Sequence, residues 1–303
     1  MARGDLYEAT AGTSSDLYYV DTGMYNTPEY GSVYILDAER PALIDTGLGT
    51  SYELILDAAT DVGVDPSDIE AIIPTHVHLD HAGGAGYLIE ECPNADVYVY
   101  EAGKRFLRDP ESLWDGTKAV IGDRLRYYVE PRPVPEDRLV GVGDGDSIDL
   151  GDHVLDVYHA PGHAFHQAVF HDRATEGVFV ADAAGINTPA LDAARYATPP
   201  ADFDLEECLK DIETIQQLDP AALYYGHFGD VEPDGVLEAF AETLQTWVDR
   251  VETKRAEIGD DEALIEYFVE RADIVGVWDE HHARGEERLN VQGVLQYLDR
   301  REV

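Results

Sequence analysis

The sequence has few cysteines and no long apolar run, and each shortage excludes a class of protein. Its two cysteines, Cys92 and Cys208, lie far apart in 303 residues, so they suit neither a disulfide framework nor a Cys-x-x-Cys metal site. No segment is as long and apolar as a membrane span, and the N-terminal residues lack the apolar core of a signal peptide. We therefore expect a soluble, cytoplasmic protein with two buried thiols and no membrane partner.

Positive charge is also scarce. The chain has 21 basic residues against 62 acidic ones, a net charge of -41, and only four of the basic residues are lysines. Phosphate binding needs a basic face, so no nucleic-acid partner is expected. The hydrophobic share of 44% is too high for a disordered acidic chain. This composition resembles cytosolic proteins of salt-accumulating halophiles, where roughly molar salt shortens the Debye length to about 3 Å.

Two β-rich blocks are predicted in the first 230 residues. Strand-like runs occur at 17–20, 32–37, 42–47, 71–75 and 96–100, and again at 147–150, 153–160, 167–172, 177–182 and 221–226. Helices are expected at about 51–62 and 83–91. Beyond Asp230, apolar residues at three and four residue spacing predict helices near 236–251, 262–271 and 289–298. We expect these last helices to pack on the main fold or to form a face for a homodimer.

One short segment, THVHLDHAGG at residues 75–84, gathers three histidines and an aspartate within six positions: His76, His78, Asp80 and His81. In an extended strand end, residues 76, 78 and 80 project to one side and His81 begins the next turn, so the four side chains can converge. Residue frequencies give this pattern by chance in roughly one such chain in a thousand. Neutral imidazole and carboxylate suit zinc or iron, so the segment predicts a metal site.

Further ligands should come from distant strand ends, because a buried metal site is assembled in space. Three residues meet this condition. His163 follows a strand through the turn Pro161-Gly162, Asp182 ends the run GVFVAD, and His227 follows the run AALYYG through a glycine. Each side chain is expected to point off a sheet edge toward the same site.

These motifs together resemble the metallo-β-lactamase superfamily, in its glyoxalase II and lactonase-like branch, over about residues 15–230. The motifs His-x-His-x-Asp-His, Pro-Gly-His, strand-terminal Asp and Gly-His occur in the order of that family. The resemblance implies an α/β fold, an αββα four-layer sandwich with metals at one edge of its two sheets. We expect a catalytic domain at 1–230, with a helical lid-like insertion at about 104–140, and a C-terminal helical extension at 231–303 packed on it.

The resemblance also implies roles for single residues. Two divalent cations, zinc or else iron or manganese, would be held by His76, His78 and His163 at the first site and by Asp80, His81 and His227 at the second. Asp182 would bridge them. A hydroxide between the cations would attack the substrate, and Asp80 could orient that hydroxide or relay a proton. Asp45, in the run ALIDTG, would support a metal ligand from behind.

The substrate implied by the resemblance is a small molecule with an ester, lactone or thioester bond. After His227 the chain reads Phe228-Gly229-Asp230, where glyoxalase II-like thioesterases carry Glu-Tyr-Thr. Gly185 stands where quorum-quenching lactonases carry a tyrosine, and Tyr224 or Tyr225 could replace that tyrosine. The motifs therefore leave the bond type open.

Two other functions stay open. The chain could be a mononuclear iron enzyme similar to the persulfide dioxygenases of the same superfamily, which use only the residues equivalent to His76, His163 and Asp182. It could also be a catalytically silent member of the superfamily. Metal content separates these two from the dinuclear hydrolase.

Other histidines have weaker patterns. His166, three residues after His163, either makes a structural hydrogen bond, or lies behind the metal ligands, or contacts the substrate. His159 is expected to pack beside its strand. His281 and His282 lie in the charged run WDEHHARGEER, which predicts a solvated helix start.

A local excess of basic residues separates the two β-rich blocks. Residues 104–132 hold seven basic side chains against five acidic ones. One interpretation is a helix pair with internal ion pairs. The other is a lid over the metals that favours a small anionic substrate through Arg124 and Arg126.

Overall fold

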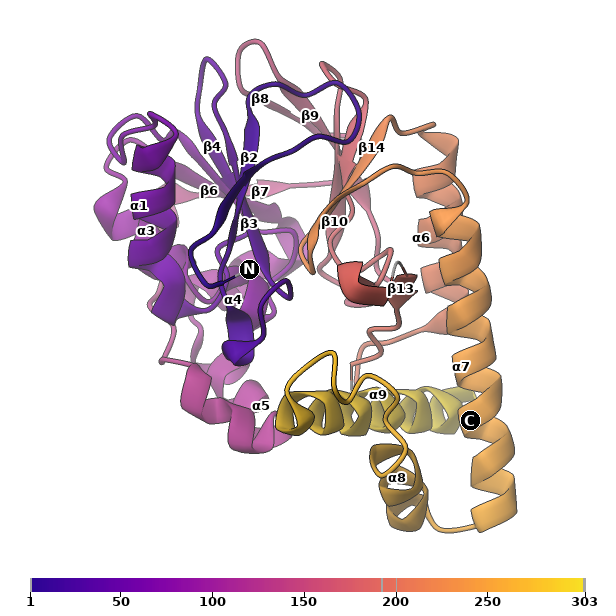
Figure 1. Cartoon of the computed structure of the whole chain (residues 1–303). Helices are drawn as coiled ribbons and strands as arrows, with labels where there is room; N and C mark the ends of the chain where they lie inside the picture. Colours follow the sequence, from indigo (N-terminus) through magenta and orange to yellow (C-terminus); the bar gives the residue numbers. More distant parts are fainter. Residues whose placement is uncertain (1, 192, 200, 302–303) are drawn as a thin grey trace.

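The computed structural model describes residues 2–191, 193–199 and 201–301 (Figure 1). Two β-sheets face each other at the centre of the molecule, and helices cover the outer face of each sheet. Helix, sheet, sheet and helix therefore form four layers, which confirms the predicted αββα sandwich.

The first sheet contains the N-terminal strands. In spatial order these are β1 (Leu6–Glu8), β2 (Leu17–Asp21), β3 (Ser32–Leu36), β4 (Ala42–Ile44), β5 (Ala71–Ile73), β6 (Asp96–Tyr100) and β7 (Leu139–Val142). Pairing is antiparallel from β1 to β4 and parallel from β4 to β7. The outer face packs on α1 (Tyr52–Asp61), α3 (Ala85–Glu91) and α4 (Glu101–Arg108). Parallel strands need crossover connections, and these helices supply them.

The second sheet follows in sequence. Its order is β15 (Gly229–Val231), β14 (Ala222–Tyr225), β11 (Gly177–Phe179), β10 (Ala168–Asp172), β9 (Val154–His159) and β8 (Ser147–Asp149). All pairs are antiparallel except β11 with β14, which the helix α6 (Leu205–Gln217) connects. A small hairpin, β12 (Ile186–Thr188) with β13 (Ala193–Arg195), lies in the same connection.

The inner faces of the sheets make one apolar core. Leu36 and Ile44 of the first sheet pack in the same cluster as Val157 and Phe170 of the second. The buried Tyr34 donates its hydroxyl hydrogen to the carbonyl oxygens of the β14–β15 turn. Because each strand end is fixed by this core, side chains that leave the strands at one edge have defined positions.

The C-terminal residues form three helices near the predicted positions: α7 (Val236–Ile258), α8 (Asp261–Val269) and α9 (Glu280–Arg301). Their apolar side chains belong to the cluster that covers the second sheet. Trp247 and Val291, for example, share that cluster with Val169 of β10. The apolar stripe is therefore buried inside this chain.

The segment between β6 and β7 contains most of the local basic excess. It forms α4, α5 (Glu111–Val120), the short helices η3 (Gly122–Tyr127) and η4 (Glu136–Arg138), and the loop between them. Several of its basic side chains have nearby acidic partners, as in the pairs Arg108–Glu136 at 3.2 Å and Lys118–Asp115 at 2.7 Å. The interpretation as internal ion pairs fits these residues. Helix η3 contacts α9.

Four further short helices complete the described elements: η1 (Met24–Asn26), η2 (Gly49–Ser51), α2 (Leu79–Ala82) and η5 (Pro189–Leu191). In the part of the chain that the structure describes, no helix is both long enough and apolar enough to cross a membrane.

Candidate metal centre

The histidine-rich segment does not continue strand β5. The strand ends at Ile73, and residues 79–82 form the short helix α2 (Leu79–Ala82). The carbonyl oxygen of His78 accepts hydrogen bonds from the backbone N–H groups of His81 and Ala82, at 3.0 and 2.8 Å. The expectation of an extended strand end was therefore wrong, because a helical turn closes here. The side chains still converge, from a loop and a helix start.

Three imidazole nitrogens form the first group. His78 Nδ1 lies 3.0 Å from His76 Nε2 and 3.1 Å from His163 Nε2. His163 comes from the turn after β9, in the second sheet, so the group joins the two sheets. His76 and His163 are buried.

A second group lies beside the first. His81 Nε2 is 3.1 Å from His227 Nε2, and Asp80 Oδ2 is 3.9 Å from the same atom of His227. His227 follows β14, at the same edge of the sandwich. Asp80, His81 and His227 are thus close enough for one metal ion.

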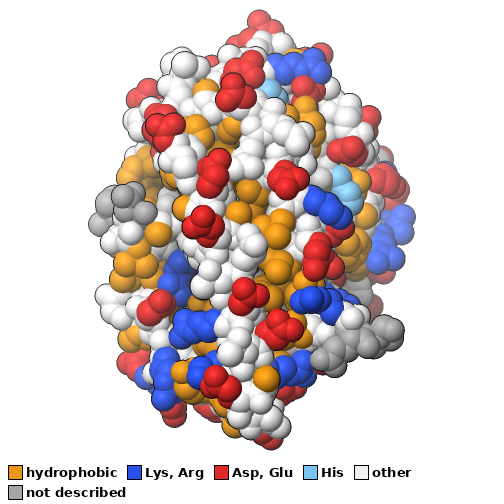
Figure 2. Space-filling model, turned by 90° about the vertical axis from the view of Figure 1, so that its right-hand side faces the viewer, with side chains coloured by type: hydrophobic (Ala, Val, Ile, Leu, Met, Phe, Trp, Pro, Cys, Tyr) orange, Lys and Arg blue, Asp and Glu red, His pale blue; other side chains and the backbone are white. Residues whose placement is uncertain are grey.

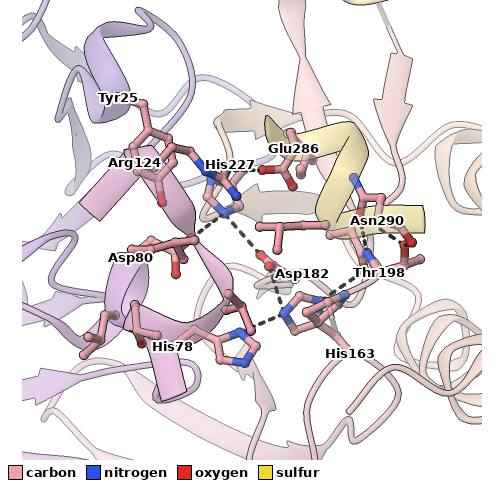
Figure 3. Close-up of a pocket in the computed structure, with 18 of the residues that line it drawn as sticks. Tyr25, His78, Asp80, Arg124, His163, Asp182, Thr198, His227, Glu286 and Asn290 are labelled. Atoms are coloured by element: carbon pink, nitrogen blue, oxygen red, sulfur yellow. Dashed lines mark hydrogen bonds and ion pairs between the residues drawn. The ribbon is translucent and has the colours of Figure 1, made fainter. Parts of the chain in front are cut away.

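Asp182 lies between the groups (Figure 3). Its Oδ2 is 3.2 Å from His163 Nε2, while its Oδ1 is 3.4 Å from His81 Nε2. Asp182 is only 6% exposed, and among the residues that the structure describes its Oδ1 has no hydrogen-bond partner. A buried carboxylate oxygen without a donor is costly. A divalent cation beside Asp182 would remove that cost, so the donor set fits bound metal.

The outward nitrogens of three histidines are held by acceptors, as is usual for metal ligands. These contacts are His81 Nδ1 with Asp45 Oδ2 at 2.8 Å, His163 Nδ1 with the carbonyl oxygen of Ala197 at 3.2 Å, and His227 Nδ1 with that of Tyr30 at 2.9 Å. Since a proton on Nδ1 makes each of these contacts, the lone pair of Nε2 points inward, toward the position a metal would occupy.

Asp45 lies behind His81, one of the candidate ligands, and contacts its Nδ1. It accepts hydrogen bonds from Thr75 N and Thr75 Oγ1, both at 2.8 Å, with the oxygen that does not face His81. Its φ is +62°, a conformation that non-glycine residues rarely adopt. A Cβ at Gly226 would lie 2.8 Å from the His81 ring, so only glycine fits there.

Burial and charge set the protonation of these groups. Burial keeps the pKa of His76 and of His163 well below the usual value, so both are neutral. Burial also lowers the pKa of His81, but Asp182, Asp45 and Asp80 together raise it to about 10. Without cations, His81 therefore holds a proton among three carboxylates. Metal binding must displace that proton, and metal affinity will rise with pH.

His166 lies next to the first group without belonging to it. Its Nδ1 accepts a hydrogen bond from Val77 N at 3.4 Å, the structural contact that was one of the two expectations. His78, His166 and Asp202 bring their ligand atoms within 4.8 Å of one another. Sequence reasoning missed Asp202, because the surrounding loop has no strand or helix pattern.

A cavity of about 140 Å³ opens above the ligands. It is lined by His78, Asp80, His163, Asp182 and His227, by Tyr25, Tyr30 and Tyr128, by Thr117, Val120, Ile121 and Arg124, and by Glu286, Leu289 and Asn290 among others. The wall therefore comes from the metal ligands, from the segment between β6 and β7, and from α9. Tyr224 and Tyr225 do not line it, since both are buried in the apolar clusters, so the suggestion that one of them replaces the lactonase tyrosine was wrong.

Two other expectations need correction. His282 is not solvated: it is 2% exposed, hydrogen-bonds Thr27 Oγ1 through Nδ1 at 2.9 Å, and meets the Tyr30 ring edge-on at 4.3 Å. The charged residues around His282 had predicted that it is exposed to solvent. His281 is exposed, as predicted. Of the two arginines proposed for the lid, Arg126 is exposed and only Arg124 lines the cavity.

The sequence matches a family model described as the metallo-beta-lactamase superfamily over residues 26–227. The metallo-beta-lactamase fold-containing protein ST1585 of Sulfurisphaera tokodaii is 27% identical over 225 residues, 72% of this chain and 80% of that protein. The acyl-coenzyme A thioesterase MBLAC2 of Gallus gallus is 28% identical over 186 residues, 55% of this chain. The match covers 62% of MBLAC2, less than two thirds of its length.

Solved structures show the same fold. The archaeal metallo-beta-lactamase superfamily protein ST1585 superposes with a TM-score of 0.68 at 22% identity, over 94% of this chain and all of that one. The metallo-beta-lactamase family protein TTHA1429 of Thermus thermophilus gives 0.66 at 21% identity, over 98% of this chain and 94% of that one. At these identities the likeness concerns the fold alone.

Proposed function

The chain belongs to the metallo-beta-lactamase superfamily, and on this premise we propose that it is a dinuclear metal-dependent hydrolase of a small-molecule ester, lactone or thioester. One observation carries the proposal. Asp182 turns its two oxygens toward two separate groups of ligands, His76, His78 and His163 on one side and Asp80, His81 and His227 on the other. A mononuclear site has no need of the second group.

Two divalent cations, zinc or else iron or manganese, would supply an acidified water as nucleophile and positive charge for the developing oxyanion. The chain's own residues position the reaction. Asp182 fixes the spacing of the two groups, and Asp45 holds His81 in the tautomer that binds. Burial raises the pKa of Asp80, but His81, His227 and His78 lower it below its usual value. Asp80 is therefore ionised on the cavity wall, placed to orient the attacking water.

The thioester class has support from a relative. MBLAC2, named an acyl-coenzyme A thioesterase, is similar over 55% of this chain. The proposal extends the thioester bond to this protein. Esters and lactones are included because hydrolysis of all three bond types attacks an acyl carbon and develops an oxyanion. Gly185 differs from the lactonase motif, and residues 228–230 differ from the motif of glyoxalase II-like thioesterases. We therefore do not assign the substrate of either branch to this chain.

Metal content and turnover test the proposal together. Protein purified in high salt should contain close to two metals per chain by elemental analysis, and it should hydrolyse at least one substrate in a panel of nitrophenyl esters, lactones and acyl thioesters. One iron per chain, no hydrolysis, and oxygen uptake with persulfides would instead assign the mononuclear oxygenase. An empty metal site with no reaction would leave the catalytically silent member.

We also propose that the acidic composition adapts a cytoplasmic protein to molar salt. Figure 2 shows acidic side chains spread over one face of the molecule, among apolar and basic ones, rather than gathered in one cluster. At a net charge of -41, self-repulsion destabilises the folded state when salt is removed. The melting temperature should fall steeply between molar and millimolar potassium chloride. A melting temperature that is the same at both would reject the adaptation.

A further inference from the structure

The loop between strands β2 and β3 lies against the candidate metal centre. It spans residues 22–31, and the carboxylate of Asp21 closes it by accepting hydrogen bonds from two of its backbone N–H groups, both at 2.8 Å. After the loop, Ser32 N donates to the carbonyl oxygen of Gly226 at 2.8 Å. Because Gly226 directly precedes the candidate ligand His227, the end of the loop is fixed beside the second group of ligands.

Tyr30, near the end of this loop, contacts His227 in two ways. Its backbone carbonyl oxygen accepts the hydrogen of His227 Nδ1 at 2.9 Å, and its ring centroid lies 4.8 Å from that of His227. Trp278 and His282 also pack against the Tyr30 ring, edge-on, with centroids 4.9 and 4.3 Å away. The side chain is therefore fixed before a ligand arrives, and a group held in this way needs no rearrangement during a reaction.

The Tyr30 hydroxyl opens into the cavity and bonds none of the described residues. The hydroxyls of Tyr224 and Tyr225 also lack a partner, but they are sealed from solvent, whereas that of Tyr30 is not. Tyr30 as a whole is only 2% exposed, and it lines the cavity. The other two tyrosines of the cavity wall, Tyr25 and Tyr128, hydrogen-bond each other through their hydroxyls. Among the described phenols of the wall, Tyr30 therefore has the hydroxyl that is free for a ligand.

Charged side chains of the cavity wall locate this hydroxyl. Burial raises the pKa of Tyr30 well above its usual value, and four charged groups of the wall also act on it. In order of effect they are Glu286, which raises the pKa, Arg124, which lowers it, and Asp80 and Asp182, which raise it. The hydroxyl therefore lies near the space that these side chains surround (Figure 3).

This space has many acceptors and few free donors. An ionised carboxylate only accepts hydrogen bonds and repels negative charge, so the acidic residues of the wall cannot stabilise an oxyanion. Arg124 already donates to Glu286 at 2.6 Å. A phenol hydroxyl is neutral and donates, so it can meet a substrate oxygen that becomes negative. The attack of water on an acyl carbon produces such an oxygen.

We propose that Tyr30 is a catalytic residue whose hydroxyl donates a hydrogen bond to the oxyanion that forms when water attacks the acyl carbon of the substrate. The inference rests on the proposed hydrolase function and adds to it a donor from the protein chain itself. No bond to Tyr30 forms or breaks in this role, since the hydroxyl keeps its proton. The oxyanion returns its electron pair to the acyl carbon, and the leaving group is expelled.

Tyr30→Phe removes the hydroxyl and keeps the ring that packs on His227. With an aryl and an alkyl derivative of one acyl group, chosen from the substrates that the unmodified protein hydrolyses, kcat should fall roughly a hundredfold for both, because one oxyanion donor is lost. KM, metal content by elemental analysis and the melting temperature should not change. The matched control is Tyr225→Phe, which removes a sealed hydroxyl that has no described partner and should leave all four quantities unchanged.

A binding experiment tests the same donor without turnover. Methylphosphonate has three oxygens on a tetrahedral phosphorus and resembles the oxyanion intermediate in shape, whereas acetate is planar and has two oxygens. Calorimetry with the zinc-loaded full chain should show that Tyr30→Phe weakens the binding of methylphosphonate roughly tenfold and that of acetate by less. Tyr225→Phe should weaken neither.

The outcomes for Tyr30 are separate from those for the hydrolase proposal. An unchanged kcat in Tyr30→Phe, a loss confined to the alkyl derivative, a rise in KM alone, or a fall in metal content would each overturn the role of Tyr30 as an oxyanion donor. Equal methylphosphonate binding by Tyr30→Phe and the unmodified protein would overturn it as well. If the unmodified protein hydrolyses no substrate, the hydrolase proposal fails, while a loss of methylphosphonate affinity in Tyr30→Phe still assigns the hydroxyl as a donor to a tetrahedral oxyanion.

Discussion

The metal centre and the wall above it are built in different ways. The candidate ligands lie in loops and a short helix that follow strands of both sheets, and three of their outward nitrogens are held by a buried carboxylate or backbone carbonyl. The recognition wall, which we define as Arg124, Glu286 and Asn290, comes from a segment between two strands and from a helix beyond the sandwich. The sandwich core thus sets the chemistry, whereas two added segments shape the pocket.

The largest effect should come from breaking the metal centre itself. His76→Ala removes a ligand of the first group and leaves His78 and His163 without a third nitrogen. Metal content should fall, and kcat/KM should drop roughly a hundred- to a thousandfold, because the charge that stabilises the oxyanion is lost. Elemental analysis and kinetics on one preparation measure both.

The matched control for that variant is His281→Ala, which changes an exposed histidine with a 47% exposed side chain. It should keep its metals and its activity. Full turnover by a metal-free His76→Ala protein would show that the ligand cluster is not the reactive centre.

A smaller effect should follow from loosening a support of the metal centre. Asp45→Asn keeps the shape of the side chain but removes the charge that faces His81 Nδ1. Changes behind a metal ligand typically weaken metal affinity about 10- to 100-fold. Chelator titration should show this shift, while Asp65→Asn, at an exposed aspartate that bonds Ser67, should show none. An unchanged titration curve would remove Asp45 from the metal centre.

The recognition wall should respond in stability more than in metal content. Asn290 Oδ1 accepts from the buried Thr198 N at 2.6 Å, so Asn290→Leu leaves that N–H unpaired at a cost of about 1–3 kcal/mol. Denaturant unfolding measures the loss, and Asn94→Leu, at an exposed asparagine, is the control. Loss of both metals in Asn290→Leu would contradict the separation of the two regions.

The smallest effect concerns a carboxyl group that supports His163 from a distance. Asp211 Oδ2 accepts from Gly162 N at 2.7 Å, and burial raises the pKa of Asp211 from 3.8 to about 7. The unfolded carboxyl ionises near 3.8, so the stability that this group contributes is fully present below that pH and is lost as the pH rises through 7.

Asp211→Asn removes that titration but keeps an acceptor for Gly162. The melting temperature of the variant, relative to the unmodified protein, should therefore be higher at pH 8 than at pH 5. A difference that does not change between these pH values would show that Asp211 does not titrate in this range.

The difference between the metal centre and the recognition wall also explains how much could be predicted from the sequence. Four ligands lie within six positions, and the other three follow strand-like runs, so spacing alone indicated His163, Asp182 and His227. The structure brings all seven together. The error was local: hydrogen bonds to the His78 carbonyl turn the segment into a helix start, which periodicity over six residues cannot distinguish from a strand end.

The recognition wall could not be predicted in this way. The apolar spacing of α9 indicates which of its faces is buried, but the position of the helix depends on contacts with residues more than 150 positions earlier, as in Arg124 with Glu286. His282 shows the same limit, because its charged neighbours indicate solvent while Tyr30 and Trp278 enclose its ring. Tertiary contacts decided both cases.

The order of the segments along the chain also sets the order in which they are synthesised and can fold. On the ribosome every metal ligand, up to His227, is synthesised before α9 (Glu280–Arg301), and growing chains fold from the N-terminal side. If the proposed cations bind once the sandwich has folded, they enter before α9 adds Glu286, Leu289 and Asn290 to the lining of the cavity. For the proposed hydrolase, metal loading would then precede the completion of the substrate pocket, so a cation that binds during synthesis would not have to pass the residues of α9 that line the finished cavity.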